Sequence, residues 1–459
     1  MKVRWGRLLV VPVAVAFVVV GGCVASGGRD TASESTDVVV VPPSPSPSPP
    51  VSAARLGGPV VGVVSYESAT TELARLDPKT LRPPAGGARL KLEGSQSVLA
   101  VAPDRSTAVF GSEMGELTVV DLVSLRRLGT VRTDVLGPAV FGGSWVGPSR
   151  LLVIGSPREG VTEVLAVDVR ARRVVGRQRV DGVVQGSARL PHGQALLVSP
   201  ANAIAPARLV VSDADADLRT VTLADVKAGY RQLEETGDSE PRIEQAIPGI
   251  AADPSGRHVY VVPADGPVAE VDVSTLTVAY HRLGRSESPL QRLARWWAPP
   301  AEAKISSGPA RTALWLGDGQ LVITGYDGSA EGHHRQIPSG LQLIDTATWT
   351  ARRVDRHSDS AMLAAGRLLG FGTAFGTGPN EANQGHGLTL YGPGNHQPVH
   401  LFGTKEVSWI QLNGDLAYVH LTDANLSDAD SYAVLDLRSG RVLHHSTGIA
   451  PDLLVPDRR

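Results

Sequence analysis

Residues 145–168, WVGPSRLLVIGSPREGVTEVLAVD, contain the pattern that decides the fold. Two short apolar runs are separated by a stretch rich in Gly, Pro and Ser, and the second run ends in Asp168. Short runs of this kind, bounded by turn-forming residues, predict antiparallel strands and not helices.

The apolar run that ends in Asp recurs along the chain. Most neighbouring copies are separated by 44 to 47 residues, and an eighth, degenerate copy ends at Tyr391-Gly392. A period of about 40 to 47 residues with four strands per unit is typical of a β-propeller. We therefore predict an all-β fold, a single propeller of four-stranded blades: eight blades by repeat count, or seven if the Gly392 copy is not a blade. The clear copies are Leu76-Asp77, Val120-Asp121, Val167-Asp168, Ser212-Asp213, Val271-Asp272, Ile344-Asp345 and Leu435-Asp436.

The two ends of the repeat region predict how the ring closes. The first unit starts at Val60 and lacks an innermost strand, whereas PDLLVPD at residues 451–457 resembles the innermost strand VLAVAPD at residues 98–104. We expect the C-terminal strand to complete blade one, which would remove the open sheet edge. The propeller domain is predicted to span residues 57–459.

The first 22 residues are predicted to be a signal peptide. Lys2, Arg4 and Arg7 precede a 13-residue apolar run, Leu8 to Val20. As a helix this run would rise about 20 Å, short of the roughly 30 Å hydrocarbon core of a bilayer. A cleavable export signal therefore fits better than a membrane span.

Val20-Gly21-Gly22-Cys23 resembles a bacterial lipobox, and Cys23 is the only cysteine of the chain. The resemblance implies that Cys23 is diacylated and becomes the mature N-terminus; the alternative is an ordinary export signal with a chance cysteine. Residues 23–56 include alternating Pro and Ser, which favours an extended, disordered stalk. The predicted location is the extracytoplasmic side of the cell membrane, with the lipid as the membrane contact.

The repeats are similar to bacterial YVTN and WD40-like propellers over nearly all of residues 57–459, although no Trp-Asp dipeptide is present. The stretch from Tyr66 to Leu81 also resembles the opening of the lactonase-type propeller family. As a whole, the chain resembles actinobacterial lipoproteins with a propeller ectodomain.

Composition excludes several classes of function. The formal net charge is −2, so the chain has no basic field to hold nucleic acid. A single cysteine excludes an internal disulfide framework and a cysteine-rich zinc site. No nucleophile elbow, phosphate loop or zinc-protease motif is present.

The lengths of the connections divide the propeller into two faces. With the strands of a blade named a to d from the central channel outward, the a–b and c–d turns form one face, which we call the short-turn face. The b–c and d–a connections form the other, the long-loop face. Five long segments all belong to the long-loop face: residues 225–248, 284–309, 326–339, 373–387 and 422–431. Long loops on a rigid scaffold are where binding usually occurs.

The candidate binding residues lie in these segments. Arg292, Arg295, Trp296 and Trp297 are residue types enriched in protein-binding hot spots, although Leu290, Leu293 and Trp297 also fit one face of a short helix packed as a lid. His333, His334 and His386 are further candidates.

No metal or cofactor is predicted. The Asp423 to Asp430 loop is the best oxygen cluster, and whether an ion occupies it or the channel stays open. We predict a membrane-anchored lipoprotein whose propeller binds a protein or cell-envelope ligand through the long-loop face. No catalytic residue is assigned; the alternative is a propeller enzyme, hydrolase-like, lactonase-like or quinoprotein-like, and we favour the non-enzyme.

Overall fold

A computed structural model describes residues 60–67, 70–112, 115–133, 140–158, 160–233, 242–285, 305–330, 336–374, 384–392, 398–422, 431–447 and 451–455. The predicted signal peptide, Cys23 and the stalk lie outside these residues. Within the described residues every regular element is a strand. No helix among them is long and apolar enough to cross a membrane.

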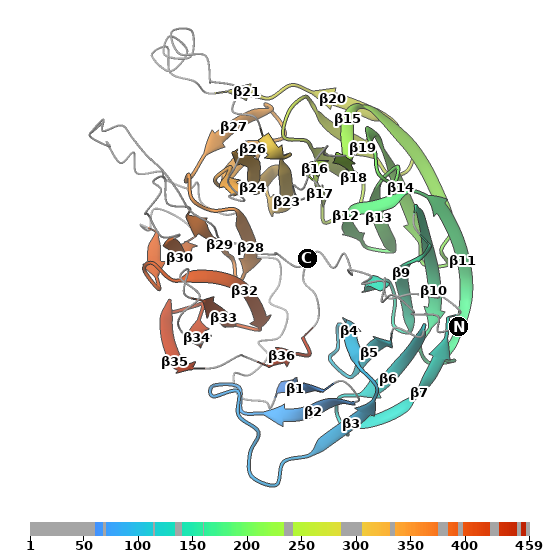
Figure 1. Cartoon of the computed structure of the whole chain (residues 1–459), viewed down its shortest axis with the longest axis vertical. Coiled ribbons are helices and arrows are strands. Elements are labelled where there is room, and N and C mark those ends of the chain that lie inside the picture. Colours follow the sequence, from blue (N-terminus) through green and yellow to red (C-terminus); the bar gives the residue numbers. More distant parts are fainter. Residues whose placement is uncertain are drawn as a thin grey trace, which may run out of the picture.

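The strands form eight sheets arranged in a ring (Figure 1), and all strand pairs in them are antiparallel except β21 with β27. The eight-bladed prediction is confirmed, and the degenerate copy that ends at Gly392 is a blade with four strands of its own. From the innermost strand outward, the first four blades are as follows. Blade one is β36 (Asp452–Leu453), β1 (Val60–Glu67), β2 (Thr70–Leu76) and β3 (Arg89–Glu93); blade two is β4 (Gln96–Val101), β5 (Thr107–Ser112), β6 (Glu116–Asp121) and β7 (Arg126–Arg132); blade three is β8 (Val140–Trp145), β9 (Arg150–Arg158), β10 (Val161–Asp168) and β11 (Arg173–Asp181); blade four is β12 (Val183–Leu190), β13 (Gly193–Ser199), β14 (Ile204–Asp213) and β15 (Leu218–Leu233), with β16 (Arg242–Ala246) added beyond β15.

The other four blades repeat the plan, and blade six carries three further strands. Blade five is β17 (Gly249–Ala252), β18 (His258–Val262), β19 (Val268–Asp272) and β20 (Val278–His281); blade six is β23 (Ala310–Gly317), β24 (Gln320–Ala330), β26 (Gln342–Asp345) and β27 (Thr350–Arg353), with β21 (Gly284–Arg285), β22 (Ile305–Ser307) and β25 (Gln336–Pro338); blade seven is β28 (Ser360–Ala364), β29 (Arg367–Ala374), β30 (Gln384–Tyr391) and β31 (Val399–Leu401); blade eight is β32 (Glu406–Asn413), β33 (Leu416–Thr422), β34 (Ser431–Asp436) and β35 (Arg441–Thr447).

The middle strands of a blade are buried on both faces, and this explains their continuous apolar sequences. All seven residues of β13 are buried, whereas the outer strand β35 has no fully buried residue. The buried apolar side chains fall into eight clusters, each containing residues from two neighbouring blades. The core is therefore a ring of interfaces between blades, and each blade needs both of its neighbours.

The recurring Asp caps the c–d turn at the end of its strand. Asp77 Oδ1 accepts hydrogen bonds from the backbone N–H groups of Lys79 (3.0 Å) and Thr80 (2.8 Å), and Leu81 completes the turn with a positive φ of 52°. At the other six Asp residues, too, the carboxylate accepts backbone N–H groups of the turn: two at five of them, and one, from Ala171, at Asp168. Backbone N–H donors favour the ionised carboxylate, which lowers the pKa of Asp77.

Arginines join the short turns of neighbouring blades. Arg172 of blade three donates to the carbonyl of Leu128 in blade two (2.8 Å), and Arg367 of blade seven donates to the carbonyl of Arg438 in blade eight (2.8 Å). Arg219 of blade four donates to two carbonyls of the c–d turn of blade five. These bonds connect blade two with blade three, blade four with blade five, and blade seven with blade eight near the short-turn face.

The C-terminal strand β36 closes the ring, as the sequence predicted. It pairs with β1 through Gly62–Leu453 and Val63–Asp452. Successive side chains of a strand point to opposite faces: Leu453 packs in the cluster between blades eight and one, and Leu454 packs in the cluster between blades one and two. Both side chains are 4 % exposed. Two adjacent leucines therefore fill two different interfaces.

The closing strand provides the first prediction. Leu453→Ala and Leu454→Ala should each lower the free energy of unfolding by about 2–5 kcal/mol, because each leaves a cavity in an interface between blades. Urea denaturation followed by tryptophan fluorescence measures this effect. Leu443→Ala is the matched control, because Leu443 lies on the outer strand β35 and is 46 % exposed. Equal losses in all three variants would show that the ring does not depend on β36.

Candidate functional site

Most of the residues predicted from sequence to bind a ligand lie outside the described residues. These are Arg292, Arg295, Trp296, Trp297, His333 and His334, together with the expected short helix around them and the Asp423 to Asp430 loop. His386 is described, on β30. The candidate site is therefore built from His386 and from the described parts of the long-loop face.

Part of the long-loop face consists of strands where the sequence analysis expected loops. Much of the 225–248 segment is an extension of β15 that pairs with β16 from Gly229–Ala246 to Leu233–Arg242. In blade six, β24 continues to Ala330 and pairs with both β22 and β25. Backbone pairing of this kind holds the described parts of these connections in a defined geometry.

A polar contact connects the added strands of blades four and six. Gln245 of β16 donates from Nε2 to the hydroxyl of Tyr326 on β24 (2.9 Å) and to the carbonyl of Gly308 (3.3 Å). An isolated parallel bridge joins Ile247 to Ala310 beside it. A side chain at Gly308 would meet the carbonyl oxygen of Gln245 at 1.6 Å, so the two segments approach as closely as backbones can.

Arg311 on β23 binds the part of β24 around Tyr326 and Asp327. Its side chain is only 10 % exposed and makes an ion pair with Asp327. Its Nη1 also donates to the carbonyl of Tyr326 (2.6 Å). Burial raises the pKa of the Tyr326 hydroxyl, the negative charge of Asp359 acts in the same direction, and the hydrogen bond from Gln245 opposes both.

His386 lies against a second histidine that the sequence analysis did not single out. The ring of His357, in the connection between blades six and seven, is 4.0 Å from the ring of His386 and inclined to it by 34°. Burial, and then the charge of His357, lower the pKa of His386, while Asp355 acts in the opposite direction. His386 therefore favours its neutral form in the folded protein.

Asp355 organises the connection that carries His357. One carboxylate oxygen accepts the backbone N–H groups of His357 (2.9 Å) and Ser358 (2.8 Å). The other accepts the hydroxyls of Ser358 (2.9 Å) and Tyr391 (2.5 Å). Burial, followed by the Asp355 charge, raises the pKa of Tyr391. This hydroxyl therefore stays protonated and holds blade seven to the connection.

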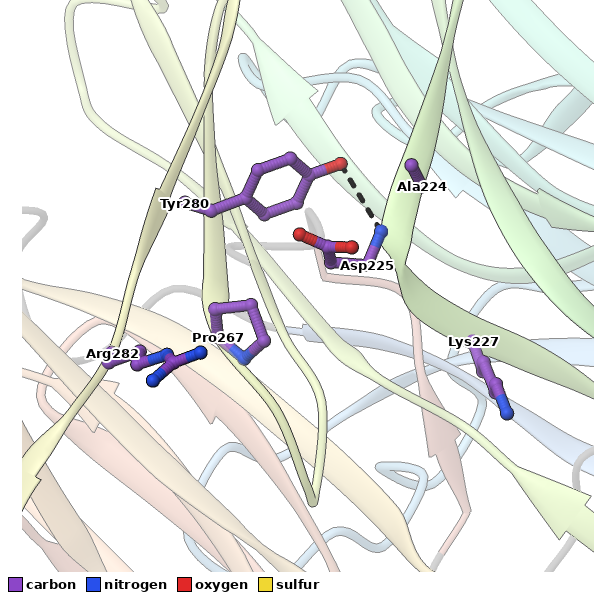
Figure 2. A pocket seen from close by; sticks show the side chains of 6 residues that line it. All are labelled: Ala224, Asp225, Lys227, Pro267, Tyr280 and Arg282. Carbon is purple, nitrogen blue, oxygen red and sulfur yellow. Dashed lines mark hydrogen bonds between the residues drawn. The ribbon is translucent and has the colours of Figure 1, made fainter.

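An open cleft of about 460 Å³ lies between the outer parts of blades four and five (Figure 2). Its residues come from the outer strand β15, from the b–c connection of blade five at Pro267, and from the outer strand and d–a connection of blade five. The cleft-lining residues are Ala224, Asp225, Lys227, Pro267, Tyr280 and Arg282. None of them was a candidate from sequence, because strand β15 could not be placed beside blade five without the fold.

A smaller cleft of about 240 Å³ lies on the short-turn face, between blades one and two. It is lined by apolar residues of the ring closure, including Val60 and Leu454, and by Arg75 and Arg105. Arg75 donates to the carbonyl of Val123, and Arg105 donates to Asn413 of blade eight. Because both arginines make contacts between blades, the residues of this cleft serve the closure of the ring.

Within the described ranges, no group of three or more His, Cys, Asp or Glu side chains is arranged to hold a metal ion. His357, His386 and Asp355 therefore form a cluster of titratable side chains whose arrangement does not match a metal site.

Comparisons with known proteins support the propeller fold and give no further information on this chain. No family model matches the chain, and no curated protein matches it. Among solved structures, the chain is similar to the dihydro-heme d1 dehydrogenase NirN in complex with DHE, with a TM-score of 0.51, 14 % identity, and coverage of 93 % of this chain and 82 % of that one. BamB from Moraxella catarrhalis has a TM-score of 0.41 and 11 % identity, with 81 % and 90 % covered. The Pan2 WD40 domain of Neurospora crassa has a TM-score of 0.40 and 12 % identity, with 74 % and 88 % covered. At such identities the likenesses carry no information on activity.

The histidine pair provides the second prediction. His386 should titrate below 6.5, and His357→Asn should raise its pKa, because the variant removes a neighbouring positive charge. Histidine-labelled NMR measures the midpoints, and His386→Asn assigns the signal. Because the folded-state pKa of His386 is below its unfolded value, protonation favours unfolding, so stability decreases as the pH falls from about 6.5. A midpoint above 6.5, or one that His357→Asn leaves unchanged, would contradict the contact.

Proposed function

We propose that the protein is a lipid-anchored lipoprotein on the extracytoplasmic side of the membrane, and that its propeller binds a protein or cell-envelope ligand through the long-loop face. Cys23 is the proposed acylation site, and residues 24–56 are the proposed stalk. The propeller itself is the part that the structure describes.

One observation carries the binding proposal. Four described strands exceed the plan of four strands per blade, β16, β21, β22 and β25, and all of them come from b–c or d–a connections. The contact of Gln245 with Gly308 and Tyr326 joins β16 to the segments around β22 and β24. A face that merely tolerated insertions would not need strand pairing or a largely covered ion pair such as that of Arg311 with Asp327. A binding surface, by contrast, requires a fixed geometry.

The added strands also present apolar side chains to solvent. Ile243 on β16 is 51 % exposed and Ile337 on β25 is 52 % exposed. Single exposed apolar residues are common on proteins, so exposure alone does not indicate a binding site. Ile243 and Ile337 are candidates because they lie on strands that are additional to the four strands of a blade. We propose that both contact the partner.

If the anchor is as proposed, the topology of the ring implies which face of the propeller points toward the membrane. Strand β1 is a b strand, so the described chain enters the ring at Val60 from the short-turn face. A stalk from Cys23 to Val60 would therefore reach the short-turn face, and the long-loop face would point away from the membrane. Residues 24–56 as polyproline II would span at most on the order of 100 Å.

The binding proposal predicts a loss of partner in defined variants. Ile243→Ser with Ile337→Ser, and separately Trp296→Ala with Trp297→Ala, should each reduce co-purification of the partner with the tagged full-length protein at least tenfold. Quantitative mass spectrometry after cross-linking in cells measures the yield. Val123→Ser is the matched control, because Val123 is 65 % exposed and lies in a short turn. Equal loss in the control, or no partner in the wild type, would overturn the proposal and favour the enzyme alternative.

The anchor is tested separately. Cys23→Ala should move the exported protein from the membrane fraction to the soluble fraction, because the only acylation site is lost. Ser26→Ala is the control and should stay in the membrane fraction. Cys23→Ala protein that is exported and still sediments with membranes would contradict the lipid anchor.

A further inference from the structure

The cleft between blades four and five lies beside a bulge in strand β15. In the pairing of β14 with β15, Ala207 is opposite Leu223 but the preceding Pro206 is opposite Lys227, so residues 224–226 have no partner in the ladder. Pro206 cannot donate a ladder hydrogen bond, which makes it suited to the edge of a bulge. Val226 is fully buried in the core between blades four and five, whereas Ala224 and Asp225 are turned outward.

The bulge places Asp225 opposite blade five. Its backbone N–H donates to the hydroxyl of Tyr280 over 3.4 Å. Figure 2 shows the Tyr280 ring, the Asp225 carboxylate and Pro267 around a common space, with Arg282 and Lys227 on either side. One aromatic ring, one acid and two cations thus surround a cleft of about 460 Å³.

Within the described ranges, the charged groups of the cleft have no ion-pair partner. Other cations of β15 have structural partners: Arg219 donates to the carbonyls of Val273 and Ser274, and Arg231 forms an ion pair with Glu244 at 2.6 Å. In the described part of the chain, by contrast, no salt bridge is formed by Lys227, Arg282 or Asp225. With no ion-pair partner among the described residues, these charged groups can face a ligand.

We propose that this cleft binds a segment of an anionic glycan, a sugar chain with one carboxylate or phosphate on some of its rings. The Tyr280 ring offers a flat apolar surface for the C–H face of a sugar. The Asp225 carboxylate accepts hydrogen bonds from sugar hydroxyls, and Arg282 on one side and Lys227 on the other are each placed to bind an anionic group of the chain. The cleft volume falls within the usual range for ligand sites of about 300–1,000 Å³.

The balance of charge selects this class of ligand. Two cations against one acid favour an anion, but Asp225 repels a densely charged one, so a ligand with sparse negative charge fits best. The cleft is open to solvent, which lets a polymer enter and leave. It offers no deep apolar pocket for the aromatic or arginine anchor of a protein partner. The inference rests on the proposed function, because it names the ligand class of the same face.

The test is direct binding to the purified full-length protein in detergent, measured by saturation-transfer NMR and calorimetry. The probes are a hyaluronan tetrasaccharide, with a carboxylate on every second ring, for the carboxylate source, glucose 6-phosphate for the phosphate source, neutral maltotriose, and triglutamate as an acidic peptide. At least one anionic sugar probe should bind tenfold or more tightly than maltotriose. Arg282→Gln with Lys227→Gln should weaken that binding at least tenfold, and added salt should weaken it in the wild type.

Two further variants distinguish the contribution of the Tyr280 ring to binding from that of its hydroxyl. Tyr280→Ala should weaken binding at least tenfold, whereas Tyr280→Phe, which retains the ring, should stay within about threefold. Arg257→Gln is the matched control and should not change binding, because Arg257 is an exposed cation of the same blade, in its a–b turn. Unchanged circular dichroism establishes that each variant is folded.

Three results would overturn the inference: no binding of either anionic sugar probe, equal binding of triglutamate, or equal loss in Arg257→Gln. If partner capture through Ile243 and Ile337 persists while the cleft binds no anionic sugar, the ligand class is wrong and the proposed function stands. If the probes bind but no partner is captured through those residues, the proposed contacts of Ile243 and Ile337 are wrong and the cleft stands.

Discussion

The structure depends on the requirement that each blade bury both of its faces. The middle strands present apolar side chains to both neighbours, so a row of blades is stable only when the last blade meets the first. The closing strand meets this requirement with few residues, because Leu453 and Leu454 enter two interfaces from one strand. Tyr418 and Tyr432 of blade eight support the closure through hydrogen bonds to the carbonyls of Pro78 and Thr80 in blade one.

The two faces of the closed ring differ in how far their connections are used for structure. The short turns are capped by Asp and joined by arginines, and both the first strand β1 and the closing strand β36 meet this face. Its hydrogen-bonding groups are largely used for structure. Among the described residues, the b–c and d–a connections add strands only to the sheets of blades four and six. Rigidity on one face therefore permits elaboration on the other.

The sequence predicts the fold because the features that determine it are local and repeated. The Asp of each copy occupies the end of a c strand, and its carboxylate caps the turn that follows, so its recurrence marks the blades. The closing strand is predictable because PDLLVPD resembles another innermost strand. Even the degenerate Gly392 copy forms a blade, since its strand pattern survives without the Asp cap.

The site is less predictable because it depends on contacts between distant segments. His357 and His386 lie on different elements, so neither their contact nor the lowered pKa of His386 can be read from spacing. The bulge at residues 224–226 depends on which residue Pro206 meets across the ladder. Strands β16, β22 and β25 form through pairing that a loop-length argument cannot foresee. The lengths of the connections distinguish the long-loop face from the short-turn face, but they do not predict which of its segments pair as strands.

The central claim is that the long-loop face, and not the short-turn face, meets the partner in the cell. A photoreactive amino acid at Ile337, compared with the same group at Val123, tests this most directly, because both side chains are exposed and belong to opposite faces. The account predicts an adduct of defined mass from position 337 in living cells and none from position 123. Adducts of equal yield from both positions, or from position 123 alone, would contradict it.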